Sequence, residues 1–186
     1  MQPNAAPGGS RHCPEDFASN GPAPCYQGRV TTHAPLIEIF IDADACPVKD
    51  ETYRVAQRYG LKTFVVANSF MMVPASPLIE RVVVEAGPDV ADDWIAERAH
   101  AGAIVITNDI PLADRTLKAG GQALSTTGRP FTADSIGSAL AQRALMDHLR
   151  STGDFMGGPR PFERRDRSEF LQALDTAVQK AKRRRA

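Results

Sequence analysis

The sequence predicts an α/β protein with a mainly parallel central sheet and helices on both faces. Three observations predict this class. Runs rich in β-branched residues alternate with stretches of helical periodicity along most of the chain. The connections between these runs have the length of right-handed crossovers between parallel strands. The 186 residues, 42% hydrophobic and 24% charged, are sufficient for one globular domain with its own core.

Residues 1–35 are predicted to form a disordered extension ahead of the domain. They include six Pro and four Gly but hardly any aliphatic residues, so they cannot bury enough apolar area to offset the entropy of ordering the backbone. We expect the α/β domain to occupy residues 36–155. Residues 156–186 are expected to complete it with a Gly-Gly-Pro-Arg segment and a basic C-terminal helix.

The domain is predicted to begin with a buried strand. Leu-Ile-Glu-Ile-Phe-Ile at 36–41 is short, mostly apolar and β-branched, and it is followed by Asp-Ala-Asp. Apolar residues at helical spacing, with Gly60 beyond them, predict a helix over 48–59. The same criteria predict strands at 62–67, 81–84 and 103–107, a turn-rich loop at 68–77 and a helix at 91–100.

The rest of the domain is predicted to be mainly helical. A helix over 111–119 has Pro near its first turn and two glycines after it, which is the asymmetry that helix ends prefer. A short strand at 122–124 can follow. Regularly spaced apolar residues predict a long helix over 133–150. A last helix is expected over 168–182, basic at its C-terminus, where the helix dipole favours cations.

The charges are segregated along the chain although the formal net charge is zero. Residues 36–159 carry 11 basic against 16 acidic side chains, and residues 160–186 carry nine against four. An acidic pocket attracts cations and a basic end attracts phosphates, so a metal-assisted phosphate chemistry fits this distribution. A solvated helix face with a basic end is the plainer alternative.

The cysteines predict neither a disulfide framework nor a zinc site. Cys13, Cys25 and Cys46 form no CxxC pair and have no His partner at zinc spacing. Cys46 also has no His in a local motif, which favours packing over a nucleophilic role. The chain shows no signal-peptide pattern at its start and no run of 18 apolar residues. We therefore expect a cytoplasmic protein that does not enter the membrane.

Aspartates follow three of the predicted strands. In a parallel sheet, ligands gather beyond the carboxyl ends of the strands. Carboxylates clustered there repel one another unless a divalent cation lies among them. The pattern therefore predicts a site for Mg²⁺ or Mn²⁺. The acids are Asp42 and Asp44 after the first strand, Asp89, Asp92 and Asp93 after the third, and Asp109 after the fourth.

Helix capping is the structural alternative for these aspartates. Asp92 or Asp93 can serve as the N-cap of the helix that follows, and Asp109 lies two residues before a proline, which suits a helix start. Capping explains Asp42 and Asp44 poorly, because a single cap does not need two acids at alternate positions after a buried strand.

Four motifs follow one another along the domain. They are Ile-Asp-Ala-Asp-Ala-Cys-Pro-Val-Lys at 41–49, Asp-Val-Ala-Asp-Asp-Trp-Ile at 89–95, Val-Ile-Thr-Asn-Asp-Ile-Pro-Leu-Ala at 105–113, and Gly-Gly-Pro-Arg-Pro-Phe at 157–162 followed by Asp166 and Arg167. Together they resemble the bacterial YaiI/YqxD family over about residues 37–180. That family is similar to PIN-like domains, including the NYN nucleases, whose acidic strand ends bind Mg²⁺ or Mn²⁺ and hydrolyse RNA.

The resemblance implies a PIN-like three-layer sandwich and a metal-dependent nuclease, with RNA as the expected substrate and DNA as an alternative. It implies that Asp42 is the first-strand metal ligand, that Asp92 or Asp93 is the acid at the helix start, and that Asp109 is the acid of Thr-Asn-Asp. Asp44 would be an additional ligand or a base that positions water. The expected supporting residues are Thr107, Asn108, Asn68 and Ser69.

The PIN pattern commonly has one more acid on a central helix. Asp50 and Glu51 are the nearest candidates for it in this sequence. The number of bound metal ions therefore stays open.

Four arginines near the C-terminus are candidates for nucleic-acid binding. Contacts of this kind, made to backbone phosphates, are independent of sequence and sensitive to salt. Pairing with neighbouring acids on the surface is the alternative. The four are Arg160, Arg164, Arg165 and Arg167.

Two other functions compete with a nuclease. A haloacid-dehalogenase-like phosphatase would use Asp42 as the nucleophile and Asp44 as the general acid and base. It would place Ser69 after the second strand and Asp109 with Asp114 on the metal, but the Lys that such enzymes need does not occur in residues 70–108. A non-catalytic RNA- or ribosome-binding module with a degenerate metal site is the second competitor.

Overall fold

Six strands and five helices make up the part of the chain that the computed structural model describes, which is residues 36–44, 46–151 and 162–185. All of these residues belong to one unit of the chain, His33–Ala186. In chain order the elements are β1 (Glu38–Asp42), α1 (Lys49–Tyr59), β2 (Lys62–Ala67), β3 (Ile79–Val83), α2 (Val90–Arg98), β4 (Ala103–Ile106), α3 (Ile110–Lys118), β5 (Gln122–Leu124), β6 (Pro130–Phe131), α4 (Ala133–Ser151) and α5 (Arg164–Arg185).

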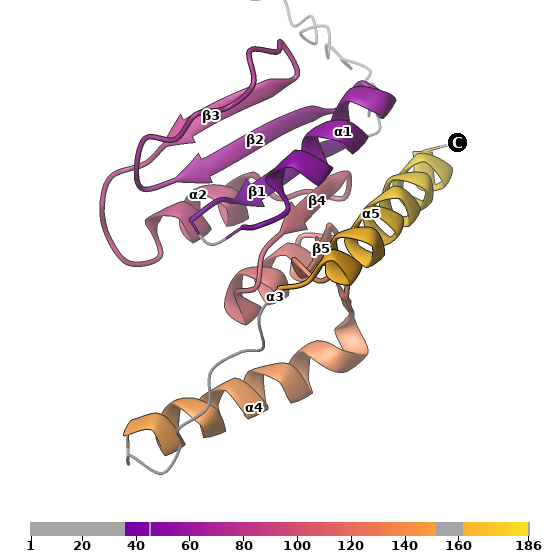
Figure 1. The fold of residues 1–186 in the computed structure, drawn as a ribbon. Coiled ribbons are helices and arrows are strands. Elements are labelled where there is room, and N and C mark those ends of the chain that lie inside the picture. The colour runs from indigo at the N-terminus through magenta and orange to yellow at the C-terminus, as the bar shows by residue number, and fades with distance from the viewer. Residues whose placement is uncertain (1–35, 45, 152–161, 186) are drawn as a thin grey trace, which may run out of the picture. The chain divides into compact units, whose positions relative to one another are not determined.

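The strands form one sheet in the order β3-β2-β1-β4-β5-β6 (Figure 1). All neighbouring pairs are parallel except β5 and β6, which are antiparallel. The chain builds outward from β1 to β3 and then returns to place β4 on the other side of β1. The direction of winding therefore reverses between β1 and β4, which is where sheets of this kind leave a crevice beyond the strand ends.

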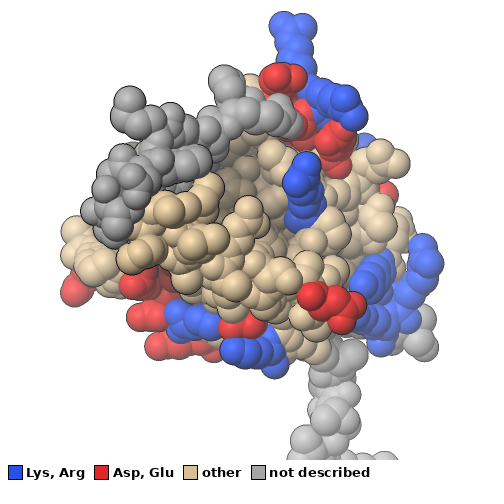
Figure 2. Space-filling view, turned by 90° about the horizontal axis from the view of Figure 1, so that it is seen from below, with Lys and Arg blue, Asp and Glu red and all other residues tan. Residues whose placement is uncertain are grey.

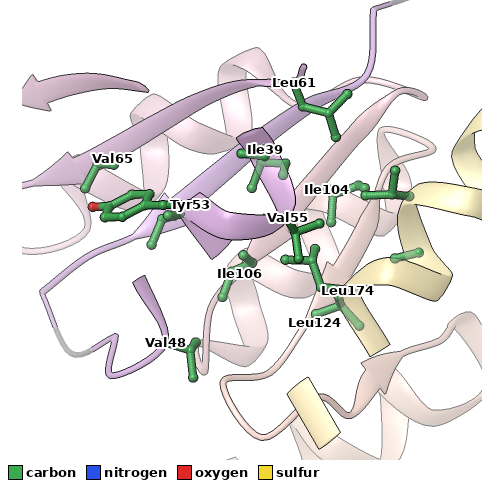
Figure 3. Packing of buried hydrophobic residues seen from close by; sticks show 14 of the residues in the cluster. Ile39, Val48, Tyr53, Val55, Leu61, Val65, Ile104, Ile106, Leu124 and Leu174 are labelled. Atoms are coloured by element: carbon green, nitrogen blue, oxygen red, sulfur yellow. The ribbon is translucent and has the colours of Figure 1, made fainter. Parts of the chain in front are cut away.

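Alternate residues of the central strands pack against different helices. Ile39 and Ile41 of β1 face α1 and α5, in a cluster that also contains Phe170 and Leu174 of α5 (Figure 3). Phe40, between them, faces the other way and packs with Ile95 of α2, in a cluster shared with α3. Because both faces of the sheet are covered by helices, the predicted three-layer α/β class is confirmed.

The predicted elements are present, with differences at their ends. Strand β3 begins at Ile79, two residues before the predicted start, and is reached from β2 by a crossover without a helix. Helix α5 begins four residues before the predicted start because the Asp166 carboxylate accepts a hydrogen bond from the Glu163 N–H at 2.8 Å and caps the helix. Strand β6 was not predicted, since two residues starting with Pro130 carry no strand pattern.

Helix α4 is attached to the domain through its N-terminal half. Ile136, which is buried, and Leu140 pack against Ala113 and Leu117 of α3. These contacts hold the N-terminal half of α4 alongside α3. Across the described ranges, no helix is both long and apolar enough to cross a membrane.

Candidate functional site

A cleft of about 330 Å³ opens beyond the carboxyl ends of the strands, where the sheet changes its direction of winding. Its carboxylates come from three segments that follow β1, β3 and β4. Backbone and polar groups of the loops after β2 and β3 complete the wall. The acidic lining residues are Asp42, Asp44, Asp89, Asp92 and Asp109, and the others are Asn68, Gly87, Pro88 and Ala91.

Asp42 lies half-buried at the end of β1. The Thr107 hydroxyl donates a hydrogen bond to its Oδ2 at 2.8 Å. Burial raises the pKa of Asp42, the bond from Thr107 opposes that rise, and the negative charges of Asp44 and Asp109 add to it. The cleft therefore makes the ionised form of Asp42 less favourable than that of a solvent-exposed aspartate.

Thr107 connects Asp42 to the Thr-Asn-Asp motif. Its Oγ1 accepts the Asp109 backbone N–H at 2.9 Å while the same hydroxyl donates to Asp42. Asn108 is turned outward to the loop after β5, where its Oδ1 accepts the Thr126 N–H at 3.1 Å. The predicted orienting role of Thr107 thus has a geometric basis, whereas Asn108 braces a neighbouring loop and does not line the cleft.

The two oxygens of Asp109 have different partners. Oδ2 accepts the Leu112 N–H at 3.0 Å, so Asp109 is the N-cap of α3. Oδ1 is paired with the guanidinium of Arg143, which comes from α4. The capping alternative is therefore confirmed for Asp109, and its second oxygen faces a cation that sequence reasoning missed. Nothing in the local sequence of α4 marks Arg143, because its partner lies 34 residues away.

Of the three aspartates at the start of α2, two line the cleft and one does not. Asp89 is the N-cap residue, with a positive φ of 60° and no capping bond from its side chain. It lines the cleft together with Asp92, whereas Asp93 points outward and pairs with Arg115 at 2.6 Å. The capping alternative is therefore wrong for Asp92 and Asp93, and of these two acids only Asp92 reaches the cleft. A left-handed backbone at a non-glycine residue is strained, and such strain is often found at functional sites.

Asp92 has the clearest sign of a crowded acidic site. Burial raises its pKa to about 6, with further increases from Asp42, Asp109 and Asp89, while Arg115 opposes them. Acids whose pKa values are raised by burial and by one another in a cleft are typical of functional sites.

We predict that Asp92→Asn makes the metal-free protein more stable at pH 7.5. The folded-state pKa of about 6 lies above the unfolded value of 3.8. Neutral Asp92 therefore contributes stability that is complete below pH 3.8 and is lost as the pH rises through 6. The gain at pH 7.5 should be on the order of 1 kcal/mol, allowing for the half-exposed side chain.

Urea unfolding with a chelator, at pH 4.5 and pH 7.5, measures this effect. Asp134→Asn, at an exposed carboxylate of α4 outside the cleft lining, serves as the control and should show no such dependence. An Asp92→Asn variant whose advantage is equal at both pH values would contradict the argument.

The loop after β2 contributes one of its two predicted residues. The Asn68 N–H donates to Asp44 Oδ1 at 3.3 Å, and Asn68 lines the cleft. Ser69 is exposed and is not part of the lining. Cys46 lies buried nearby, where desolvation raises the pKa of its thiol to about 11, so it is a packing residue, as predicted.

The donor chemistry of the cleft fits a hard cation. The side chains that meet there offer carboxylate oxygens with no sulfur or imidazole among them, which is the donor set that Mg²⁺ and Mn²⁺ prefer. In their present arrangement, no three Asp, Glu, His or Cys side chains of the described chain are close enough together to hold one ion. Binding would therefore require the carboxylates to draw together.

The three described arginines among the C-terminal candidates are not part of the cleft lining. Arg167 donates to both carboxylate oxygens of Glu51, at 2.9 and 3.0 Å, and to the Pro47 carbonyl at 3.1 Å. Arg165 pairs with Glu169 at 2.6 Å. The surface-pairing alternative is confirmed for Arg165. Glu51, a candidate for a further metal ligand, forms an ion pair with Arg167 instead. Arg164 is exposed, and Arg160 lies outside the described residues.

The fold and the cleft define a three-layer α/β protein with an acidic pocket where the sheet changes its direction of winding, between β1 and β4. The family model described as "Uncharacterized BCR, YaiI/YqxD family" matches residues 40–180. The chain belongs to this family, as its motifs predicted.

Relatives with the name UPF0178 protein are similar to this chain over most of its length. One from Caulobacter sp. (strain K31) is 70% identical over 145 residues, which is 78% of this chain and 96% of the relative. One from Gluconacetobacter diazotrophicus is 60% identical over 151 residues, 81% of this chain and 98% of the relative. No solved structure matches the chain.

Proposed function

We propose that the acidic cleft is the active site of a divalent-metal-dependent nuclease that hydrolyses RNA. One observation carries the proposal. Carboxylates that follow β1, β3 and β4 line the same small cleft, where the sheet changes its direction of winding. Burial, and in addition the repulsion between these carboxylates, raises the pKa values of Asp42 and Asp92. A cluster of this kind is unfavourable without a cation, so its presence needs a reason beyond folding.

The carboxylates of Asp42, Asp92 and Asp109 would hold Mg²⁺ or Mn²⁺, with Asp44 and Asp89 at the rim. A bound divalent ion supplies positive charge, a lower pKa for water and polarisation of the phosphodiester. Thr107 fixes the orientation of Asp42 through its hydroxyl. Asp44 is exposed at the rim, where its carboxylate can take a proton from the attacking water.

The residues required for a phosphatase fit this site less well. Asp114, which a haloacid-dehalogenase-like enzyme would place on the metal, pairs with Lys118 at 2.6 Å along α3. Neither Asp114 nor Ser69 is among the lining residues. The similarity of the family to PIN-like nucleases favours phosphodiesters over phosphomonoesters. A cleavage assay distinguishes the proposed nuclease from a module that binds RNA without cleaving it.

We expect Mn²⁺ to raise the melting temperature of the metal-free protein. An ion that binds the folded state alone stabilises it by about 2.7 kcal/mol at a hundredfold excess over Kd. For a chain of this size, that corresponds to a shift of about 5–10 °C. Thermal unfolding with and without millimolar Mn²⁺ measures it. Asp42→Asn should lose most of the shift and Asp134→Asn should keep it, whereas an unchanged wild-type curve would count against a metal site.

A cleavage screen tests the activity itself. Single-stranded RNA, structured RNA, single-stranded DNA and a phosphomonoester are each incubated with the protein and Mg²⁺ or Mn²⁺. We expect cleavage of RNA and no release of phosphate from the monoester. RNA binding without cleavage in either metal would identify the non-catalytic module, and phosphate release that depends on Asp42 would identify the phosphatase.

A further inference from the structure

An exposed aromatic side chain lies beside the acidic cleft. Phe70 is 67% exposed, and the guanidinium of Arg81 lies over its ring, 4.0 Å from the ring centre. We infer that Phe70 and Arg81 form a subsite on which an unpaired base of the RNA stacks, next to the phosphate held at the cleft. The inference rests on the proposed function of the cleft. It adds a contact with the bases to the metal chemistry of the carboxylates.

The loop after β2 brings Phe70 close to the cleft. Asn68 lines the cleft, and its N–H donates to Asp44 Oδ1 at 3.3 Å. Phe70 follows Asn68 by two residues. Because consecutive Cα atoms are about 3.8 Å apart, the Cα atoms of these two residues are at most about 7.6 Å apart. A nucleotide next to a phosphate at the cleft is therefore within reach of the ring.

Arg81 comes from β3, which is the end strand of the sheet. β3 runs parallel to β2, with Val83 opposite Ala67, and Asn68 follows Ala67 directly. The carboxyl end of β3 therefore lies at the same edge of the sheet as the cleft. Val83 is on the same side of β3 as Arg81 and is 50% exposed, so Phe70 is not an isolated apolar residue on this surface.

The loop that contains Phe70 is anchored by other residues. Met71 and Val73 are partly buried and pack against the core cluster beneath α1 and α5. The Met71 carbonyl accepts a hydrogen bond from Arg81 Nη1 at 3.2 Å. These contacts hold the loop in place, whereas Phe70 contributes little to packing. Exposed apolar groups that adjoin a cleft are typical of binding surfaces.

The pair of Phe70 and Arg81 has the chemistry that unpaired bases bind. Arg81 lies over one face of the ring, and most of the remaining surface of Phe70 is open to solvent. Bases stack on aromatic rings and on guanidinium planes whatever their identity. Among the described residues that line the cleft none is basic. The charge of Arg81 therefore offsets part of the repulsion between the carboxylates and the RNA backbone.

The face seen in Figure 2 offers no broad basic surface. Basic and acidic side chains lie next to one another around its border, and its middle is largely uncharged (Figure 2). Phosphate contacts alone would hold RNA weakly on such a face. Stacking supplies affinity that does not depend on a basic surface.

An RNA with one abasic nucleotide tests the inference. The probe is a single-stranded RNA of uniform sequence in which one nucleotide lacks its base, and its cleavage with Mn²⁺ is mapped along the chain. The wild type should cut the phosphate at one fixed distance from the missing base about tenfold less often, because no base can stack there. Phe70→Leu keeps an apolar side chain but has no ring, so it should cut that phosphate as often as its neighbours.

The kinetics of cleavage of the intact RNA give a second readout. In Phe70→Leu the KM for RNA should rise about tenfold with little change in kcat, because the base contact is made equally before and during the reaction. Phe70→Trp should keep the low KM, since its ring also stacks. Met72→Ala, at an 83% exposed position of the same loop, is the control and should match the wild type. A structural role of Phe70 would instead lower the urea midpoint of Phe70→Leu.

A second copy of the chain is the other occupant that would cover Phe70. Sedimentation without RNA separates the two: a dimer that Phe70→Leu dissociates would overturn the inference, and sedimentation that the variant leaves unchanged supports it. If the wild type cleaves RNA and neither the abasic nucleotide nor Phe70→Leu alters the cleavage, the inference is wrong and the proposed function stands. If the wild type cleaves no RNA with any metal, the proposed function fails and the inference fails with it.

Discussion

We expect Asp42→Asn to reduce metal-dependent RNA cleavage by at least about 100-fold. Changing a residue that merely supports a metal ligand already costs about 10–100-fold in activity, and Asp42 is proposed to bind the ion directly. It lies at the end of β1, and the hydroxyl of Thr107 holds it in place at 2.8 Å. The amide of Asn accepts the same hydrogen bond but carries no charge to bind the ion.

The loss should occur without unfolding. The charges of Asp44 and Asp109 act against ionised Asp42, so removing its charge relieves repulsion in the metal-free protein. Initial rates at saturating Mn²⁺, together with urea unfolding of the same samples, measure both effects. Asp114→Asn is the matched control, since that carboxylate pairs with Lys118 outside the lining. Equal losses in the two variants would favour a phosphatase-type metal site.

The second large effect is expected on stability, at the pair of Arg167 and Glu51. The Glu51 side chain is 7% exposed and receives two hydrogen bonds from Arg167, at 2.9 and 3.0 Å. Arg167→Ala leaves this buried carboxylate without its cation and detaches the first turn of α5 from α1. Breaking a buried pair in this way costs about 3–5 kcal/mol. We expect about 2–4 kcal/mol here, because Arg167 itself is half-exposed.

Urea unfolding of Arg167→Ala against Arg165→Ala measures the difference. Arg165 is 82% exposed and pairs with Glu169 one turn away, so its replacement should change the stability by no more than about 0.5 kcal/mol. Adding Glu51→Gln to Arg167→Ala should recover part of the loss, since the uncompensated charge is then removed. Equal stability of the two arginine variants would show that the pair contributes nothing to the fold.

The acidic strand ends could be predicted from sequence because each depends on a local pattern. A buried run followed by Asp42 and Asp44 marks the end of β1, and the same holds for Asp109 after β4. Once the sheet is parallel, the ends of neighbouring strands must meet at one edge. The register of β1 with β4, where Ile41 lies opposite Ile106, brings these acids to the same cleft.

The pairs that depend on tertiary contacts could not be predicted in this way. Arg167 was expected to bind nucleic acid, yet its partner Glu51 lies 116 residues away on α1. Arg143 has no local motif, and its contact with Asp109 follows from how α4 packs on α3. Asp92 and Asp93 point in different directions because neighbouring residues of a helix are about 100° apart. Which of the two reaches the cleft depends on how α2 packs on the sheet, and no local pattern signals that.

The most direct test of the proposed metal-dependent nuclease is a titration with Mn²⁺. It compares the occupancy of the cleft by Mn²⁺ with the rate of RNA cleavage at each concentration. Free Mn²⁺ is followed by electron paramagnetic resonance while cleavage is sampled from parallel mixtures. The account predicts that the two curves rise together and that Asp42→Asn loses both. Cleavage that persists unchanged in Asp42→Asn, or Mn²⁺ that fills the cleft without any cleavage of RNA, would contradict it.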